Sequence, residues 1–274
     1  MSLANASRSE LTKQFTTAMW WILAAVLLAY VGVTAGGLAA TFGALSTGAI
    51  PAEATNGSAM PSDVIPPLIY SLATSVGYVF PLLIGTLLVT NEFRHKTLTP
   101  TFLAVPRRGI ALGAKVTAGV VMGLLYAVVA LVAAVGVGAL ALALVGADTR
   151  LGHAETWAMI ARMAAAFVLW TLIGIGIGTL VRNQVAAVVG VLAFTQFVEP
   201  IARTVATFVD GVSGVTTYLP GAASDALVGA SIYTSLGGAS ASALPWWAGG
   251  LVLLGYAAAL LIIGYLTSWR RDVA

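Results

Sequence analysis

The sequence predicts an all-α membrane protein with six transmembrane helices. Hydrophobic residues make up 59% of the 274 residues and charged residues only 8%, whereas charged residues make up roughly 25% of a typical soluble domain. The mean hydropathy of +0.96 indicates the same class. Because the polar segments between the apolar runs are all short, we expect residues 1–274 to form one transmembrane domain without a separately folded soluble part.

A helix needs about 20 apolar residues to cross a bilayer, and six stretches of the chain meet this requirement. The predicted spans are residues 19–45, 66–90, 111–145, 157–181, 185–208 and 246–268. The third stretch exceeds the length of a perpendicular span, so its helix should tilt or begin in the cytoplasm. The first is longer than the core of a signal peptide, which has about 7–15 residues, so we expect a retained span.

The positions of Lys and Arg predict that both termini lie in the cytoplasm. With six spans, ten basic residues fall on the cytoplasmic side and only Arg150 falls in an outer loop. The ten are Arg8, Lys13, Arg94, Lys96, Arg107, Arg108, Lys115, Arg182, Arg270 and Arg271. We therefore expect a multi-pass protein of the cell (plasma) membrane. Because these residues flank apolar runs, the pI of about 9.3 does not indicate a nucleic-acid partner.

The sequence offers no catalytic constellation. It contains no cysteine, which excludes disulfides, thiolate metal sites and a cysteine nucleophile. His95 and His153 fall on opposite sides of the predicted membrane and cannot share a metal, and there is no His-Glu-x-x-His motif. We expect no enzyme activity, metal or cofactor in this chain by itself.

The segment between the fifth and sixth spans, residues 210–245, mixes apolar residues with Gly, Ala and Ser. This composition predicts short re-entrant or extracellular helices, with a Gly/Ser-rich loop as the alternative. In the fourth span, Gly174 and Gly178 lie one turn apart. Because no strand precedes them, we interpret them as a close helix contact rather than a dinucleotide site.

Three ionisable residues within or near the spans form a possible intramembrane polar site: Arg162, Glu199 and Arg203. Arg162 can instead extend to the lipid headgroups. Glu199 and Arg203 are four residues apart on one helix face, which predicts a structural ion pair, although Glu199 is also a candidate proton or cation site. No relay of Asp, Glu or His crosses the spans, so we expect a mostly apolar cavity and a hydrophobic or amphiphilic substrate.

A dense polar segment, residues 91–110, separates the second and third spans. Thr99 is expected to cap a short helix that begins at Pro100 and carries the apolar pair Phe102 and Leu103 between charged flanks. Such a surface suits a soluble protein partner. Anionic lipid headgroups would attract the same basic residues, so the composition leaves both interpretations open.

The motif in this segment consists of Glu92, Phe93, Arg94, His95, Thr97 and Thr99, followed by Leu103, Pro106, Arg108 and Lys115. It resembles the cytoplasmic segment of permease subunits of ABC-2 type ATP-driven transporters, particularly actinobacterial ones. The wider layout, with six spans and a Tyr-Leu-Pro-Gly stretch at 218–221, is also similar. The resemblance covers essentially the whole chain and is specific over residues 91–115.

The resemblance implies a coupling helix that docks into a separate ABC ATPase subunit. Its docking residues would be Glu92, Phe93, Arg94, His95, Thr99, Pro100, Phe102, Leu103, Pro106 and Arg108. It also implies an amphipathic helix at residues 8–15 along the inner leaflet and a second permease copy, as a homodimer. The stretch 109–116 is one residue short of a phosphate loop and lacks the hydroxyl that would bind Mg²⁺. ATP and Mg²⁺ are therefore expected in the partner subunit.

The expected function is thus that of a permease subunit that exports a hydrophobic or amphiphilic substrate through the lipid bilayer. Two alternatives remain open from the residues alone. One is a membrane scaffold or sensor that binds another cytosolic protein through residues 91–108. The other is an ATP-independent transporter or channel.

Overall fold

The computed structural model describes residues 2–50, 61–105, 107–206, 213–231 and 244–269. These residues form helices and no strand, and six of the helices are long and apolar enough to cross a membrane. They are Met19–Ser46, Ile65–Arg94, Arg108–Leu144, Ala154–Leu180, Gln184–Val205 and Trp246–Thr267. The predicted class, an all-helical protein with six candidate transmembrane helices, is confirmed.

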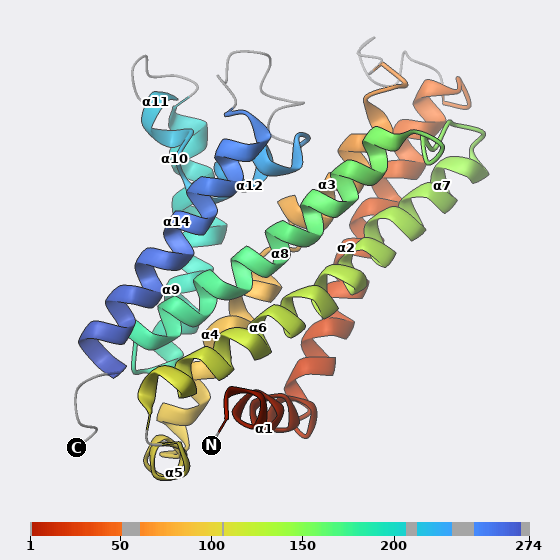
Figure 1. Ribbon diagram of the computed structural model, residues 1–274. Coiled ribbons are helices and arrows are strands. Elements are labelled where there is room, and N and C mark those ends of the chain that lie inside the picture. Colours follow the sequence, from red (N-terminus) through yellow and green to blue (C-terminus); the bar gives the residue numbers. More distant parts are fainter. Residues whose placement is uncertain (1, 51–60, 106, 207–212, 232–243, 270–274) are drawn as a thin grey trace.

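The structure divides some of these spans into shorter elements and also contains helices outside them. In chain order they are α1 (Leu3–Phe15), α2 (Met19–Ser46), α3 (Ile65–Ser75), α4 (Val79–Arg94), α5 (Leu98–Ala104), α6 (Arg108–Leu131), the π-helical turn η2 (Val132–Val137), α7 (Gly138–Leu144), α8 (Ala154–Leu180), α9 (Gln184–Ala193), the π-helical turn η3 (Phe194–Val198), α10 (Glu199–Val205), α11 (Ser213–Thr216), α12 (Pro220–Val228), α14 (Trp246–Gly264) and the π-helical turn η4 (Tyr265–Trp269). The long helices form one bundle (Figure 1). Helices α1 and α5 lie at one end of it, called the α5 end, and α10 to α12 lie toward the other, called the α12 end.

Helix α8 is the centre of the bundle and packs against α4, α6 and α14. Glycines make this packing possible. A Cβ atom on Gly174 would collide with the carbonyl oxygen of Leu82, and one on Gly178 would lie 2.7 Å from the carbonyl oxygen of Thr86. The predicted close helix contact at these two glycines is confirmed, and the partner helix is α4.

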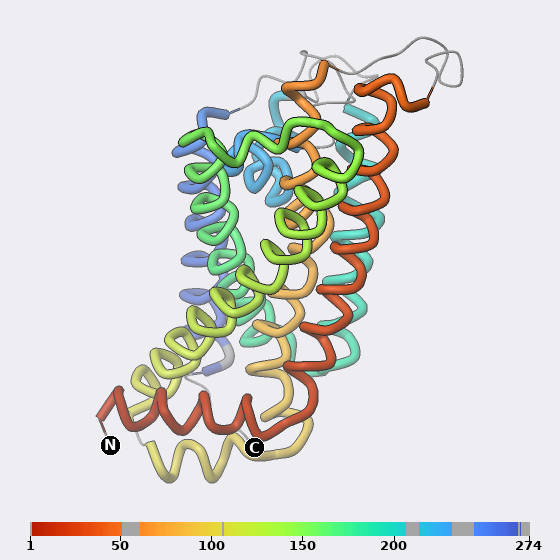
Figure 2. Tube along the Cα trace, turned by 90° about the vertical axis from the view of Figure 1, so that its right-hand side faces the viewer, coloured from red at the N-terminus to blue at the C-terminus, as the bar shows by residue number. Residues whose placement is uncertain are grey.

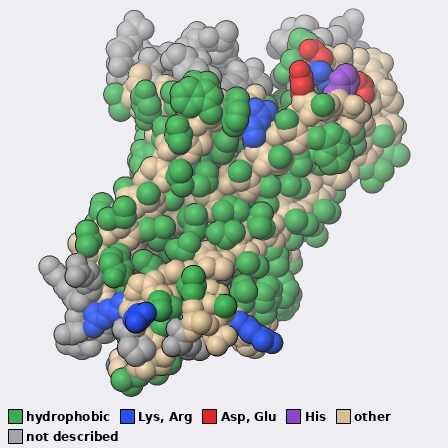
Figure 3. All heavy atoms as spheres, viewed as in Figure 1, with side chains coloured by type: hydrophobic (Ala, Val, Ile, Leu, Met, Phe, Trp, Pro, Cys, Tyr) green, Lys and Arg blue, Asp and Glu red, His purple; other side chains and the backbone are tan. Residues whose placement is uncertain are grey.

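The outward faces of the bundle are apolar. Helix α14 and the span formed by α9 to α10 are mostly exposed along their length, and their surface residues include valine, leucine and isoleucine. Figure 3 shows hydrophobic side chains over the middle of the molecule and basic side chains gathered near the α5 end. An apolar belt of this kind is what lipid tails require of a membrane protein.

Helix α1 lies across the α5 end, at a steep angle to the long helices (Figure 2). It begins after Ser2, whose hydroxyl accepts a hydrogen bond from the backbone N–H of Asn5 at 3.3 Å. It packs mainly against α6. The helix is longer than the expected range of residues 8–15, because its first turns also find buried contacts, including Ala6.

The second span is not one continuous helix. It is interrupted by a turn at residues 76–78 between α3 and α4, which the apolar pattern alone did not indicate. The third and fifth spans are interrupted by the π-helical turns η2 and η3. Non-helical backbone at membrane depth is tolerated where protein or a cavity surrounds it, and π-turns are frequent at functional sites.

Candidate functional site

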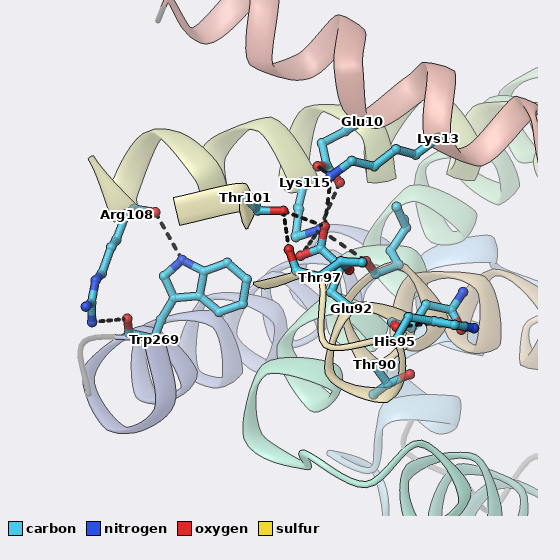
Figure 4. Close-up of polar contacts among 12 residues, drawn as sticks. Glu10, Lys13, Thr90, Glu92, His95, Thr97, Thr101, Arg108, Lys115 and Trp269 are labelled. Atoms are coloured by element: carbon cyan, nitrogen blue, oxygen red, sulfur yellow. Dashed lines mark hydrogen bonds and ion pairs between the residues drawn. The ribbon is translucent and has the colours of Figure 1, made fainter. Parts of the chain in front are cut away.

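Four charged residues meet at the α5 end in a network that joins α1, α4 and α6 (Figure 4). The ammonium nitrogen of Lys115 lies 2.8 Å from Glu10 Oε2 and 2.9 Å from Glu92 Oε2. Lys13 Nζ lies 2.7 Å from Glu10 Oε1 and 2.9 Å from Glu92 Oε1. Lys115 is fully buried, and Glu10 and Glu92 are only 5% and 6% exposed. Two carboxylates therefore neutralise two ammonium groups, of which Lys115 is buried and Lys13 is 43% exposed at the edge of the network.

The network perturbs the titration of its two α1 members. Burial alone would raise the pKa of Glu10, but the ammonium groups of Lys115 and Lys13 outweigh burial, so the pKa lies below 4.5. Burial would lower the pKa of Lys13, but the hydrogen bond to Glu10 and the charge of Glu92 raise it above 10.5. Both shifts favour the charged forms.

These shifts predict how stability depends on pH. A lowered carboxyl pKa adds stability above pH 4.5 that disappears as pH falls through the lowered value, and a raised Lys pKa adds stability that disappears only above 10.5. We expect the unfolding temperature of the purified protein to be flat from about pH 5 to 10 and to fall in acid. The Glu10→Gln variant, which has no carboxylate to protonate there, should show a smaller acid loss. An equal acid loss in both proteins would contradict the assignment.

Helix α5 forms the tip of this end, and its two apolar side chains have different environments. The Phe102 ring packs edge-on against Trp269, with ring centroids 5.4 Å apart, and the Arg108 guanidinium lies 5.3 Å from the Phe102 ring centroid. Arg108 also donates a hydrogen bond to the Trp269 carbonyl at 3.1 Å. Leu103, by contrast, is 78% exposed. Of the expected apolar pair, Phe102 thus anchors α5 to Trp269, whereas the Leu103 side chain is exposed.

The helix begins earlier than predicted. Its first residue is Leu98 and its N-cap is Thr97, whose side chain makes no capping hydrogen bond, so the assignment of Thr99 as the cap before Pro100 was wrong. The reason lies in packing. Leu98 is buried in the hydrophobic cluster at the α5 end, so the helix begins at this residue rather than at Pro100. Thr99 and Pro100 are exposed within the first turn.

The other predicted docking residues are divided between surface and interior. Arg94 and His95 are exposed; Arg94 donates to Gln184 Oε1 at 3.3 Å, and His95 Nδ1 lies 2.8 Å from the Asn91 carbonyl oxygen. Phe93 is half-buried. Glu92 is bound to two lysines of its own chain and is only 6% exposed. Pro106 lies outside the described residues.

A second polar region lies toward the α12 end, where a cavity of about 270 Å³ opens between α2, the α3–α4 turn, the span of η3 and α10, and α12. The three elements that depart from regular transmembrane helices here, the turn at 76–78, η3 and α12, all contribute to its lining. Tyr78 donates a hydrogen bond to the Thr195 carbonyl at 3.0 Å, which joins the turn to η3.

Glu199 is fixed at the amino end of α12. Its Oε1 accepts hydrogen bonds from the backbone N–H groups of Gly221 at 2.6 Å and Ala222 at 3.2 Å. These belong to the first turn of α12, whose N–H groups have no partner within the helix, so the carboxylate acts as a cap supplied by another span. A side chain at Gly221 would collide with it, which explains the glycine in the Tyr-Leu-Pro-Gly stretch.

The predicted ion pair between Glu199 and Arg203 is not formed as a direct contact, although the Arg203 charge still acts on the Glu199 carboxylate. Arg203 pairs with Asp225 of α12 at 2.5 Å, and Ser231 donates to the same carboxylate oxygen at 2.7 Å. Asp225 lies in the segment 210–245, for which short re-entrant helices were predicted, and it is buried because α12 folds inward against α14, α8 and α3. Asp225 of α12 is thus the ion-pair partner of Arg203, in place of Glu199, which the four-residue spacing suggested.

Arg162 does not join the other two members of the predicted polar site. Its guanidinium lies 5.9 Å from the centroid of the Trp246 ring and close to Gly229, where an added Cβ atom would lie 3.5 Å from it. Its Nε is buried without a hydrogen-bond acceptor among the described residues. The structure therefore brings Glu199 and Arg203 together around one cavity and leaves Arg162 outside its lining.

Sequence reasoning missed Glu10, Lys13 and Asp225 as members of buried polar clusters. The signal for the first two was available, since an acidic and a basic residue three apart precede the first span. No local signal identifies Asp225, because its burial depends on how α12 packs. Within the described residues no group of three His, Cys, Asp or Glu side chains could hold a metal ion.

These features define the class of the protein as a helical, multi-pass membrane protein with a buried charge network at one end and a polar cavity toward the other. Comparison with models of known protein families and with curated proteins gives no match to this chain.

Proposed function

We propose that this chain is the membrane-spanning permease subunit of an ABC-2 type ATP-driven transporter, which exports a hydrophobic or amphiphilic substrate and receives its energy from a separate ATPase subunit. In this proposal the α5 end faces the cytoplasm, and a second copy of the chain completes the pathway. The resemblance of residues 91–115 to the coupling segment of that family suggested the function, and the geometry of α5 supports it.

The observation that carries the proposal is that α5 is a fixed, protruding helix with a free apolar side chain. Leu98, the first residue of α5, is buried. Phe102 packs against Trp269, and Thr101 donates to Glu92 Oε1 at 3.5 Å. Leu103 projects from the helix and is 78% exposed. An exposed apolar residue on a rigid support at the tip of a bundle is typical of a binding surface.

The charge network gives such a surface a mechanical connection to the spans. Glu92 ends the second span and Lys115 lies near the start of the third, and α5 lies between them in the sequence. Helix α1 is attached through Glu10 and Lys13. A force applied to α5 by an ATPase would therefore reach α4, α6 and α1 together, which is what coupling of ATP hydrolysis to transport requires.

The test is the Leu103→Asp variant, in a chain co-expressed with the ABC ATPases of its source cell. We expect the wild-type chain to retain one ATPase in stoichiometric amount, and the variant to retain at least about tenfold less, because loss of a central apolar anchor costs about 2 kcal/mol or more. The measurements are the ATPase retained on purification and vanadate-sensitive ATP hydrolysis.

Leu103→Met is the matched control, since it keeps an apolar side chain of similar volume and should retain the ATPase. Both variants should elute and unfold like the wild type, because Leu103 makes little contact with its own chain. Wild-type retention by Leu103→Asp would remove the docking assignment. A wild-type chain that retains no ABC ATPase would favour the scaffold or the ATP-independent transporter.

A further inference from the structure

The cavity toward the α12 end is a built site rather than a packing defect. Its wall contains a broken helix, a π-helical turn and the amino end of an inserted helix, three features that cost backbone hydrogen bonds in a membrane protein. Each is held by a specific contact. Tyr78 bonds to Thr195, Trp170 donates to Ser224 at 3.1 Å, and Glu199 caps α12.

The charges that line the cavity do not balance. Arg203 neutralises Asp225, with which it forms an ion pair, and Glu199 is the remaining carboxylate of the lining. Glu199 is only 2% exposed. Its Oε1 is occupied by two backbone N–H groups, but its Oε2 is buried and accepts no hydrogen bond from the described residues. A buried carboxylate oxygen without a donor carries a free-energy cost that a ligand with a donor would relieve.

We propose that this cavity binds an organic monocation, an ammonium group on an apolar body, and that the ammonium group donates to Glu199. As a statement about the transported substrate, the inference rests on the proposed function; as a binding site, it stands on the cavity alone.

An ammonium group fits this lining better than a metal ion. No three metal-ligating side chains converge in the described residues, whereas an ammonium needs only one carboxylate and a few neutral oxygens. Thr195, Gln196 and Ser75 supply neutral polar groups in the lining, and Tyr30, Val76 and Pro200 supply apolar and aromatic surface. The volume of about 270 Å³ lies slightly below the roughly 300–1,000 Å³ of small-molecule sites, which suits a small ligand.

The experiment measures the thermal unfolding of the purified chain alone, in nanodiscs at constant salt, with three six-carbon probes that differ only in headgroup: hexylamine, hexanol and hexanoate. A ligand that binds only the folded state raises the unfolding temperature in a saturable way. At neutral pH hexylamine is a cation, so we expect it to give a saturable rise in unfolding temperature, and hexanol and hexanoate to give at least tenfold weaker binding. Equal binding of hexanol or hexanoate overturns the proposal.

The Glu199→Gln variant keeps an amide oxygen for the N–H groups of Gly221 and Ala222 but removes the charge. We expect its dissociation constant for hexylamine to rise at least tenfold. Glu155→Gln, the same change at an exposed position in the first turn of α8, should bind like the wild type. Wild-type affinity in Glu199→Gln overturns the site; if that variant does not fold, the headgroup series on the wild-type chain still decides.

Failure of this site and failure of the proposed function are distinguishable. Hexylamine binding is measured without any ATPase, whereas the Leu103→Asp test measures ATPase retention without any ligand. Amine binding by a chain that retains no ATPase would support the site and contradict the transporter. ATPase retention by a chain that binds hexylamine no better than hexanol would support the transporter and contradict the site.

Discussion

Replacement of Lys115 by methionine is expected to destabilise the protein by about 3–5 kcal/mol, because removal of one partner from a buried ion pair leaves an uncompensated charge. In this chain the change would leave Glu10 and Glu92 facing each other with only Lys13 between them. Lys115 is fully buried and also donates to the Leu88 carbonyl at 3.3 Å, so its replacement also leaves that carbonyl without this donor.

The measurement is unfolding of the purified variant in mild detergent, by heat or by titration with a denaturing detergent. Lys96→Met is the matched control, since it is the same chemical change at an exposed residue and should cost little. The double variant Lys115→Met with Glu10→Gln removes one negative charge together with the positive one, and we expect it to recover part of the lost stability. A Lys115→Met protein as stable as Lys96→Met would show that the network contributes nothing to folding.

The spans could be predicted from the sequence because lipid imposes a strong constraint: each must be helical and apolar for about 20 residues. The interruptions of the spans, at residues 76–78, η2 and η3, could not be predicted in this way. The turn at residues 76–78 contains Gly77 but no proline, and its helix resumes at Val79 within an unbroken apolar run. The break coincides with the cavity and with the hydrogen bond from Tyr78 to Thr195, which lies 117 residues further along the chain.

The candidate sites were predictable to the extent that their chemistry is local. The dense polar segment at residues 91–110 indicated the position of α5. Glu199 was identified because a carboxylate within a span is conspicuous in an apolar sequence. Their partners are distant. Glu92 was interpreted as part of a docking surface, yet it binds Lys13 and Lys115, and Arg203 was paired with its neighbour on the same helix rather than with Asp225. Spacing along one helix can suggest a pair, but it cannot show that another element comes closer.

The contact between α4 and α8 leads to the second large expected effect, at Gly174. A methyl group there would collide with the Leu82 carbonyl and lie 2.9 Å from the Thr86 backbone nitrogen, and backbone atoms cannot rotate away as a side chain can. We expect Gly174→Ala to destabilise the protein by about 3 kcal/mol, at the upper end of the cost of overpacking, because α8 must move away from α4. The same shift would disturb the packing of α8 against α14, because an added Cβ atom on Gly176 would lie only 2.5 Å from Leu260 Cβ.

Gly190→Ala provides the matched control for this prediction. Gly190 lies within α9, and a methyl group there meets nothing within 4 Å, so the substitution brings only the helix propensity of alanine. That protein should be unchanged or more stable by up to about 1 kcal/mol. The free energy of unfolding of both variants, measured in the same detergent, separates packing from propensity. If Gly174→Ala unfolded like Gly190→Ala, the close approach of α4 and α8 would not be a property of the folded protein, and α8 would have to pack through a different face.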